Sequence, residues 1–214
     1  MYVPKPFEET DRAVLHDLIR AHPFGALAVV TARGLGVDHL PFLLDETTGP
    51  FGVLQGHIAR ANPLWKATLA DLDAVAIFQG PHHYITPSWY ATKQETGKVV
   101  PTWNYVAVHA YGRPRFIDDA RWLREHVSAL TARHENGRPA PWKVTDAPED
   151  YVTARAGAIV GIEIPIQRLQ GKAKLGQNRP DADRDGMVRG LRGELDQSAR
   201  ALAELISGRP KRSP

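Results

Sequence analysis

Short runs in which apolar and polar residues alternate recur along this chain, and a period of two is typical of β-strands. Turn residues separate the first runs: Gly34-Leu-Gly36 follows one, and Thr47-Thr-Gly-Pro50 follows the next. The first two runs predict a hairpin because only a short turn lies between them. Predicted strands cover residues 24–32, 37–45, 51–58, 74–78 and 158–169, and residues 103–117 predict a strand pair or one bent strand.

Apolar residues at spacings of three and four predict helices between and after these strands. Thr10 is expected to cap the first helix, and Asn62-Pro63 opens a short one. A capping box at Asp146-Ala-Pro-Glu149 predicts another short helix. The longer predicted helices cover residues 11–21, 122–130 and, as a single carboxy-terminal helix, 187–205.

Residues 80–102 contain three prolines among aromatic residues, so they cannot form one regular element and predict a long ordered loop. Strands without regular strand–helix alternation favour a closed or partly closed antiparallel barrel, mainly β with peripheral helices. We expect one domain over residues 1–207, followed by a disordered tail over residues 208–214.

The amino-acid composition limits the chemistry and the cellular location that we expect for this protein. The 214 residues include no cysteine, which excludes disulfides and thiolate chemistry and fits a reducing compartment. The amino terminus has acids and prolines where a signal peptide needs a basic start and an apolar run, and no apolar stretch approaches the length of a membrane span. We therefore expect a cytoplasmic protein with no membrane partner.

Several signatures of other classes of protein are missing. The chain has no Walker loop, no dinucleotide fingerprint and no G-x-S-x-G elbow. Its nine histidines show no metal-ligand spacing, so no metal site is expected. The net charge of +3 comes from scattered basic residues, which argues only weakly for nucleic acid.

Three polar clusters remain as candidate sites. The first runs from His57 to Pro63 at a predicted strand–helix junction, where helix N–H groups and Arg60 suit a phosphate, although Asn62 also reads as a simple helix cap. The second spans residues 87–105, where aromatic rings stand beside Lys and Asn; such rings suit a flat heteroaromatic ligand but are also common in cores. The third spans residues 171–180, where basic and amide side chains suit a phosphate or a flavin edge, or form an ordinary basic loop.

Segments of these clusters and of other parts of the chain resemble the PaiB family of FMN-binding regulatory proteins. They are MYVPKPFEE, ARANPLW, YITPSWY, GKVVPTWNY, APWKVTDAP, IVGIEI and KLGQNRP, in the order that the family shows. The resemblance implies an FMN-binding split β-barrel like that of pyridoxamine phosphate oxidases, usually a homodimer with flavin at the subunit interface. It also implies the cofactor contacts His57, Arg60, Asn62, Trp103, Asn104, Lys174, Gln177, Asn178 and Arg179. Gly176 departs from the serine of the family pattern, and the lost hydroxyl is expected to weaken phosphate binding.

Three functions follow from this resemblance. PaiB is a negative transcriptional regulator, but the chain has no helix-turn-helix pattern and its carboxy-terminal helix mixes acids with arginines, so DNA binding is less well supported than FMN binding. The alternative is a flavin-dependent oxidoreductase, an NAD(P)H:flavin reductase or oxidase, with His57, His83 and His109 as proton donors by pKa class alone and no catalytic residue assigned. A haem-binding protein is the third, less favoured reading.

Overall fold

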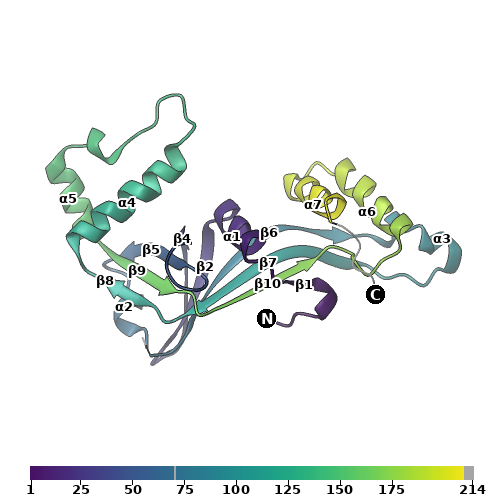
Figure 1. The fold of residues 1–214 in the computed structure, drawn as a ribbon, viewed down its shortest axis with the longest axis horizontal. Coiled ribbons are helices and arrows are strands. Elements are labelled where there is room, and N and C mark those ends of the chain that lie inside the picture. The colour runs from purple at the N-terminus through teal and green to yellow at the C-terminus, as the bar shows by residue number, and fades with distance from the viewer. Residues whose placement is uncertain (70, 210–214) are drawn as a thin grey trace. The chain divides into compact units, whose positions relative to one another are not determined.

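The computed structural model describes residues 1–69 and 71–209. The chain divides into two compact units, which are described separately (Figure 1). Unit 1 comprises residues 1–18, 79–108 and 170 onwards, and unit 2 comprises residues 19–78 and 109–169.

Unit 1 is a sheet with two helices packed on one face. Its strands follow the order β1-β10-β7-β6, and β1 and β10 pair antiparallel. Helices α6 and α7 lie side by side (Figure 1), and their buried residues Met187, Leu191 and Leu202 form one core with Val106 and Leu175 of the sheet side. The elements with residues in this unit are β1 (Glu8–Glu9), α1 (Arg12–Ala21), β6 (Ala74–Ile85), α3 (Thr92–Thr96), β7 (Thr102–Gly112), β10 (Arg168–Lys174), α6 (Asp181–Gly193), α7 (Gln197–Ser207) and the 3-10 helices Lys5–Phe7 and Pro87–Trp89.

The expected carboxy-terminal helix is wrong as a single element, because α6 ends at Gly193 and α7 begins at Gln197. Asp196 accepts a hydrogen bond from the backbone N–H of Ser198 at 3.0 Å and caps the second helix. Leu195, which the periodicity places on the apolar stripe, is 93% exposed. Asp196, a residue type that commonly caps helices, therefore marked the break in the sequence, but the apolar spacing continues past it and predicted one helix.

The loop expected over residues 80–102 is shorter than predicted, because β6 continues to Ile85 despite Pro81. The following segment contains the 3-10 helix Pro87–Trp89 and α3. Trp89 packs so closely on α6 that a side chain at Gly186 or Gly190 would overlap it, so this segment is anchored on the helix.

Unit 2 contains a four-stranded sheet of order β4-β5-β9-β8, and β2 pairs with both β3 and β6. The pairs β2–β3, β2–β6, β4–β5, β5–β9 and β8–β9 are antiparallel, and helix α4 packs on β9. The further elements of this unit are β2 (Phe24–Thr31), β3 (Gly34–Pro41), β4 (Leu43–Asp45), β5 (Val53–Ala59), α2 (Leu64–Ala67), β8 (Arg115–Ile117), α4 (Ala120–Glu135), α5 (Glu149–Gly157), β9 (Ile159–Pro165) and the 3-10 helix Val144–Asp146.

The predicted hairpin is confirmed, with Thr31 opposite Gly34, so that the turn is Ala32-Arg33 instead of the glycines. The alternation of Phe51, Val53 and Gln55 predicts those residues on the buried face of this strand, but on β5 the more deeply buried face carries Leu54, Gly56 and Ile58. The strand expected over 158–169 is two strands, β9 and β10, because Ile166 and Gln167 lie between them. Residues 103–117 do form two strands, β7 and β8.

Two predicted caps are also wrong. Asp11, not Thr10, accepts a hydrogen bond from the backbone N–H of Ala13 at 2.9 Å. Asp146 accepts from the backbone N–H of Lys143 at 2.8 Å, and α5 has no side-chain cap. The first cap lies one residue after the predicted one, and the Asp146 carboxylate satisfies an N–H group that precedes it instead of the start of α5.

Antiparallel sheets with flanking helices confirm the predicted class, with helices and strands sharing the described residues about equally. Within those residues no helix has the length and apolar character needed to span a membrane. Of the expected tail, Gly208 ends α7 and the Arg209 carbonyl accepts from Arg184 at 2.9 Å; residues 210–214 lie outside the described part.

Candidate functional site

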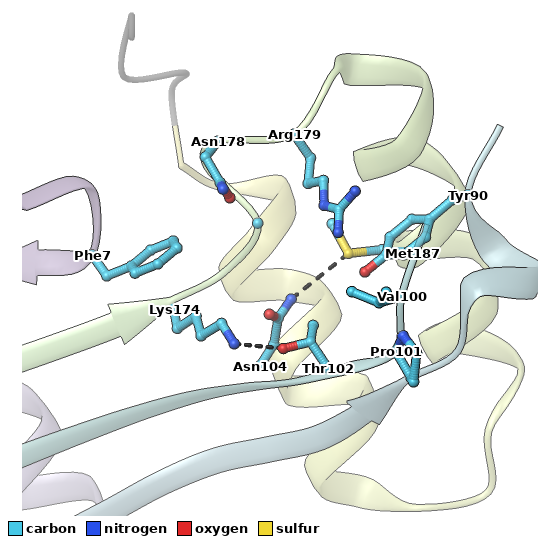
Figure 2. A pocket seen from close by; sticks show the side chains of 11 residues that line it. Phe7, Tyr90, Val100, Pro101, Thr102, Asn104, Lys174, Asn178, Arg179 and Met187 are labelled. Carbon is cyan, nitrogen blue, oxygen red and sulfur yellow. Dashed lines mark hydrogen bonds between the residues drawn. The ribbon is translucent and has the colours of Figure 1, made fainter. Parts of the chain in front are cut away.

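A cavity of about 240 Å³ opens in unit 1 where strands β7 and β10 and helix α6 meet (Figure 2). It collects side chains from the second and third polar clusters, which are about 70 residues apart in the sequence: Asn104 from one, Lys174, Asn178 and Arg179 from the other. Phe7, Tyr90, Val100, Pro101, Thr102, Gly176 and Met187 complete the lining.

Two cations face this cavity. Lys174 Nζ donates to Thr102 Oγ1 at 2.5 Å, and burial, opposed by Tyr105 and reinforced by Lys172 and Arg179, lowers the pKa of Lys174. The Arg179 guanidinium lies over the Tyr90 ring, 4.5 Å from its centroid. An anion in the cavity would relieve the repulsion between Lys174 and Arg179.

Two amides add neutral donors. Asn104 is 1% exposed, and the hydrogen bond shown for its side chain is a weak one from Nδ2 to Met187 Sδ at 3.7 Å. Asn178 is exposed on the loop between β10 and α6 (Figure 2). A buried amide with so little bonding lacks the partners that such groups normally have, and it lines the cavity.

Gln177 and Trp103 do not line this cavity. Gln177 Oε1 accepts from Leu175 N at 2.8 Å and its Nε2 donates to Ala173 O at 2.5 Å, so this side chain braces its own loop. Trp103 alternates with buried Asn104 on β7 and is 53% exposed on the other face, beside His82 and Tyr84. Adjacent residues of one motif thus serve opposite faces of the sheet.

Gly176 adopts a φ of +73°, which favours glycine, and a Cβ there would overlap the Met187 methyl group. The departure from serine therefore coincides with a methionine that fills the vacant space.

The first cluster lies in unit 2 and is engaged within that unit. Arg60 forms an ion pair with Asp118 at 2.5 Å and donates to the Gly157 and Ile159 carbonyls, and the ion pair raises the pKa of Arg60. Asn62 Oδ1 accepts from Leu64 N at 2.9 Å, which is a helix-capping contact, and its Nδ2 donates to Asp38.

His57 belongs to a histidine pair. Its Nδ1 lies 3.0 Å from Nε2 of His126, which is 4% exposed, and burial lowers the pKa of His57. Burial and then the His57 ring lower the pKa of His126 from 6.5 to about 4. His83 stacks on Trp89, and His109 lies 3.4 Å from the Tyr111 hydroxyl. The three histidines named as candidate proton donors therefore have different surroundings.

Sequence reasoning missed Tyr90, Thr102 and Met187 as lining residues. Tyr90 and Thr102 belong to YITPSWY and GKVVPTWNY, two of the segments that carry the family resemblance. The sequence could therefore have indicated both as site residues. Met187 was assigned only to the apolar stripe of a helix. Within the described residues, no group of three or more His, Cys, Asp or Glu side chains is arranged to hold a metal ion.

Solved structures of other proteins show the same fold. The chain resembles the flavocytochrome Anf3 of Azotobacter vinelandii, with a TM-score of 0.56 and 15% identity over 78% of this chain and 69% of that one. It also resembles the FAD- and haem-binding protein of Mycobacterium smegmatis, with a TM-score of 0.56 and 19% identity over 78% of this chain and 73% of that one. The chain therefore shares the fold of these two proteins.

A family model described as "Putative FMN-binding domain" matches residues 1–168, and the chain belongs to this family. The Bacillus subtilis protease synthase and sporulation protein PAI 2 is 31% identical over 99% of both chains, which confirms the PaiB resemblance. An uncharacterised protein of Emericella nidulans is 36% identical over 98% of this chain and 97% of its own.

Proposed function

We propose that this protein binds FMN through the unit 1 cavity and acts as a PaiB-type regulatory protein. The observation that carries the proposal is a three-quarters-buried arginine, Arg179, whose guanidinium has no hydrogen-bond acceptor among the described residues, in a cavity shared with Lys174 and Asn104. Guanidinium and ammonium groups with amide donors are what a phosphate ester requires.

The cavity fits one end of FMN. At about 240 Å³ it is smaller than the 300–1,000 Å³ usual for a complete small-molecule site, so it matches the phosphate end of the cofactor better than the whole molecule. Bound flavin supplies hydride and electron chemistry. The residues assigned to FMN in this unit are Asn104, Lys174, Asn178 and Arg179; Trp103 remains a candidate for ring contact as an exposed aromatic residue.

His57, Arg60 and Asn62 stay as proposed FMN contacts on the family resemblance alone. All three make hydrogen bonds within unit 2, so each would have to exchange or share these partners to meet a ligand. Gln177 supports the site by holding the loop that carries Asn178 and Arg179.

The regulatory part of the proposal is supported by similarity to PAI 2, whose name refers to protease synthesis and sporulation. A location in the cytoplasm, where such regulation takes place, belongs to the same proposal. Direct DNA binding is not part of it.

A homodimer is also proposed. Residues on the outward face of β2 and β3, including Phe24, Leu35 and Val37, are 65%, 79% and 58% exposed. Ala28 and Val30 pair with Val37 and Leu35 on the same face, so this side of the hairpin is apolar where an antiparallel sheet facing water is normally polar. A second copy of the chain is the partner that the family resemblance implies.

FMN binding is tested by isothermal titration calorimetry. We expect saturable binding of one FMN per chain, weakened about tenfold or more in Arg179→Ala because a charge-assisted hydrogen bond is lost. Arg189→Ala, at an exposed arginine of helix α6, which follows the Arg179 loop, is the control and should bind as the wild type does. No heat and no saturation with millimolar FMN would remove the proposal.

A further inference from the structure

Arg179 lies close to a buried carboxylate without being captured by it. Asp183 is fully buried in the first turn of α6, and its Oδ2 lies 4.0 Å from Arg179 Nη1, the outer limit of an ion pair. The guanidinium instead lies over the Tyr90 ring and retains its donors for the cavity that it lines.

Thr92 explains why the carboxylate does not take the guanidinium. The Thr92 backbone N–H donates to Asp183 Oδ1 at 2.9 Å, and the Thr92 hydroxyl donates to Asp183 Oδ2 at 2.8 Å. Both oxygens of Asp183 are thus already bonded to one residue of α3. The oxygen nearest to Arg179 is the one that the hydroxyl occupies.

The charges at the cavity favour a strong anion. Lys174 and Arg179 contribute two positive charges and Asp183 one negative charge, which leaves a net charge of about +1 beside the amide of Asn104. A phosphate monoester carries about −1.5 to −2 at pH 7 and offers three acceptor oxygens. It therefore complements the net positive charge, and its oxygens can accept hydrogen bonds from Lys174, Arg179 and Asn104.

We propose that Thr92 is a positioning residue that occupies the Asp183 carboxylate, keeps the Arg179 guanidinium from hydrogen-bonding to it, and so gives the cavity its affinity for a phosphate monoester. This rests on the proposed function, because it assigns the phosphate of FMN to the cavity. Asp183 has two opposing effects. Its hydrogen bonds to Thr92 hold α3 in place, but its charge competes with the phosphate for Arg179.

Two substitutions are expected to act in opposite directions. Thr92→Val removes the hydroxyl, frees Oδ2 to capture Arg179, and should weaken FMN binding about tenfold. Asp183→Asn can keep both contacts to Thr92, with its Nδ2 donating to the hydroxyl, but removes the competing charge and should strengthen FMN binding about threefold or more.

Calorimetric titration of each variant with FMN and with riboflavin, which lacks the phosphate, tests this. Riboflavin affinity should be unchanged in both variants, so that only the FMN-to-riboflavin ratio moves. Asp185→Asn, an exposed aspartate of the same helix, should leave the ratio at the wild-type value. Thermal melting of each variant confirms that it is folded.

The possible failures are distinguishable. A wild-type protein that binds neither FMN nor riboflavin removes the proposed function itself. Equal wild-type affinity for both flavins leaves flavin binding intact and overturns the phosphate assignment. A loss of FMN and riboflavin affinity together in Thr92→Val, or weaker FMN binding in Asp183→Asn, shows a structural role only and overturns the positioning role.

Discussion

Gly176 combines two constraints at one residue. Its φ of +73° lies in the left-handed region, where a side chain costs about 1–2 kcal/mol. The Met187 methyl group also occupies the place of the missing Cβ. This glycine therefore shapes the loop that carries Asn178 and Arg179.

Gly176→Ser, which restores the residue of the family pattern, is expected to destabilise the protein by about 2–4 kcal/mol, because it adds overlap with Met187 to the backbone cost. Urea unfolding measures the change. Gly97→Ser is the matched control: Gly97 has a φ of +66° with open space around its Cβ position, so it carries the backbone cost alone. Equal losses in both variants would show that Met187 adjusts freely.

Helix α4 is joined to strands β5 and β9 by a set of polar side-chain contacts. His126 stacks on Trp122, with ring centroids 5.0 Å apart, and meets His57 of β5. Trp122 Nε1 donates to Glu163 of β9 at 3.1 Å, and Gln55 donates to the same carboxylate oxygen at 3.2 Å. Nδ1 of His126 is buried without a hydrogen-bond partner, so the interface has no acceptor ready for a second proton on this ring.

Stability is expected to fall in acid because of this pair. The folded state holds His126 neutral down to a pKa of about 4, while the unfolded chain takes up a proton near 6.5. A lowered histidine pKa contributes stability above pH 6.5 that is lost as the pH falls toward 4, by about 3 kcal/mol in total. Urea unfolding at several pH values between 7 and 4 follows this loss.

His126→Gln provides the comparison, because glutamine can still bond to His57 but does not titrate. The variant should be less stable at pH 7 and should lose less stability than the wild type between pH 6.5 and 4. Parallel pH profiles for the two proteins would show that His126 does not carry the acid sensitivity.

At the scale of the whole molecule, the apolar outer face of the β2–β3 hairpin is the feature that one chain leaves unexplained. Leu35 and Val37 are exposed apolar side chains on a face where a strand in contact with water normally carries polar residues. Burial of this face against a second chain removes that surface from water, which is the main driving force of association.

Val37→Lys is expected to convert a dimer to a monomer, or to weaken the dimer at least tenfold, because burial of a lysine at such an interface is unfavourable. Size-exclusion chromatography with light scattering measures the mass over a range of concentrations. Leu195→Lys, at an exposed leucine between α6 and α7, should leave the mass unchanged. A wild-type protein of about 24 kDa at every concentration would contradict the proposed homodimer.

Much of the fold was predictable because local patterns and packing agree. The hairpin of β2 and β3 and helix α4 follow from period and turn residues alone. The break between α6 and α7 and the division of β9 from β10 were missed, because apolar spacing continues across both breaks and only capping and strand pairing decide them. For the site, the chemistry of Lys174, Asn178 and Arg179 was visible, whereas the face on which each motif residue lies was not.

The amino-acid sequence by itself determined the class of fold, the family and the type of group that meets a ligand, because periodicity, turn residues and ordered motifs are local properties of a chain. Tertiary structure alone decided which of those groups share a cavity. Asn104 and Trp103 are neighbours in sequence but lie on opposite faces of β7, while Asp183 and Thr92, 91 residues apart, are hydrogen-bonded. Strand alternation separates the first pair, and hydrogen bonds between α3 and α6 join the second.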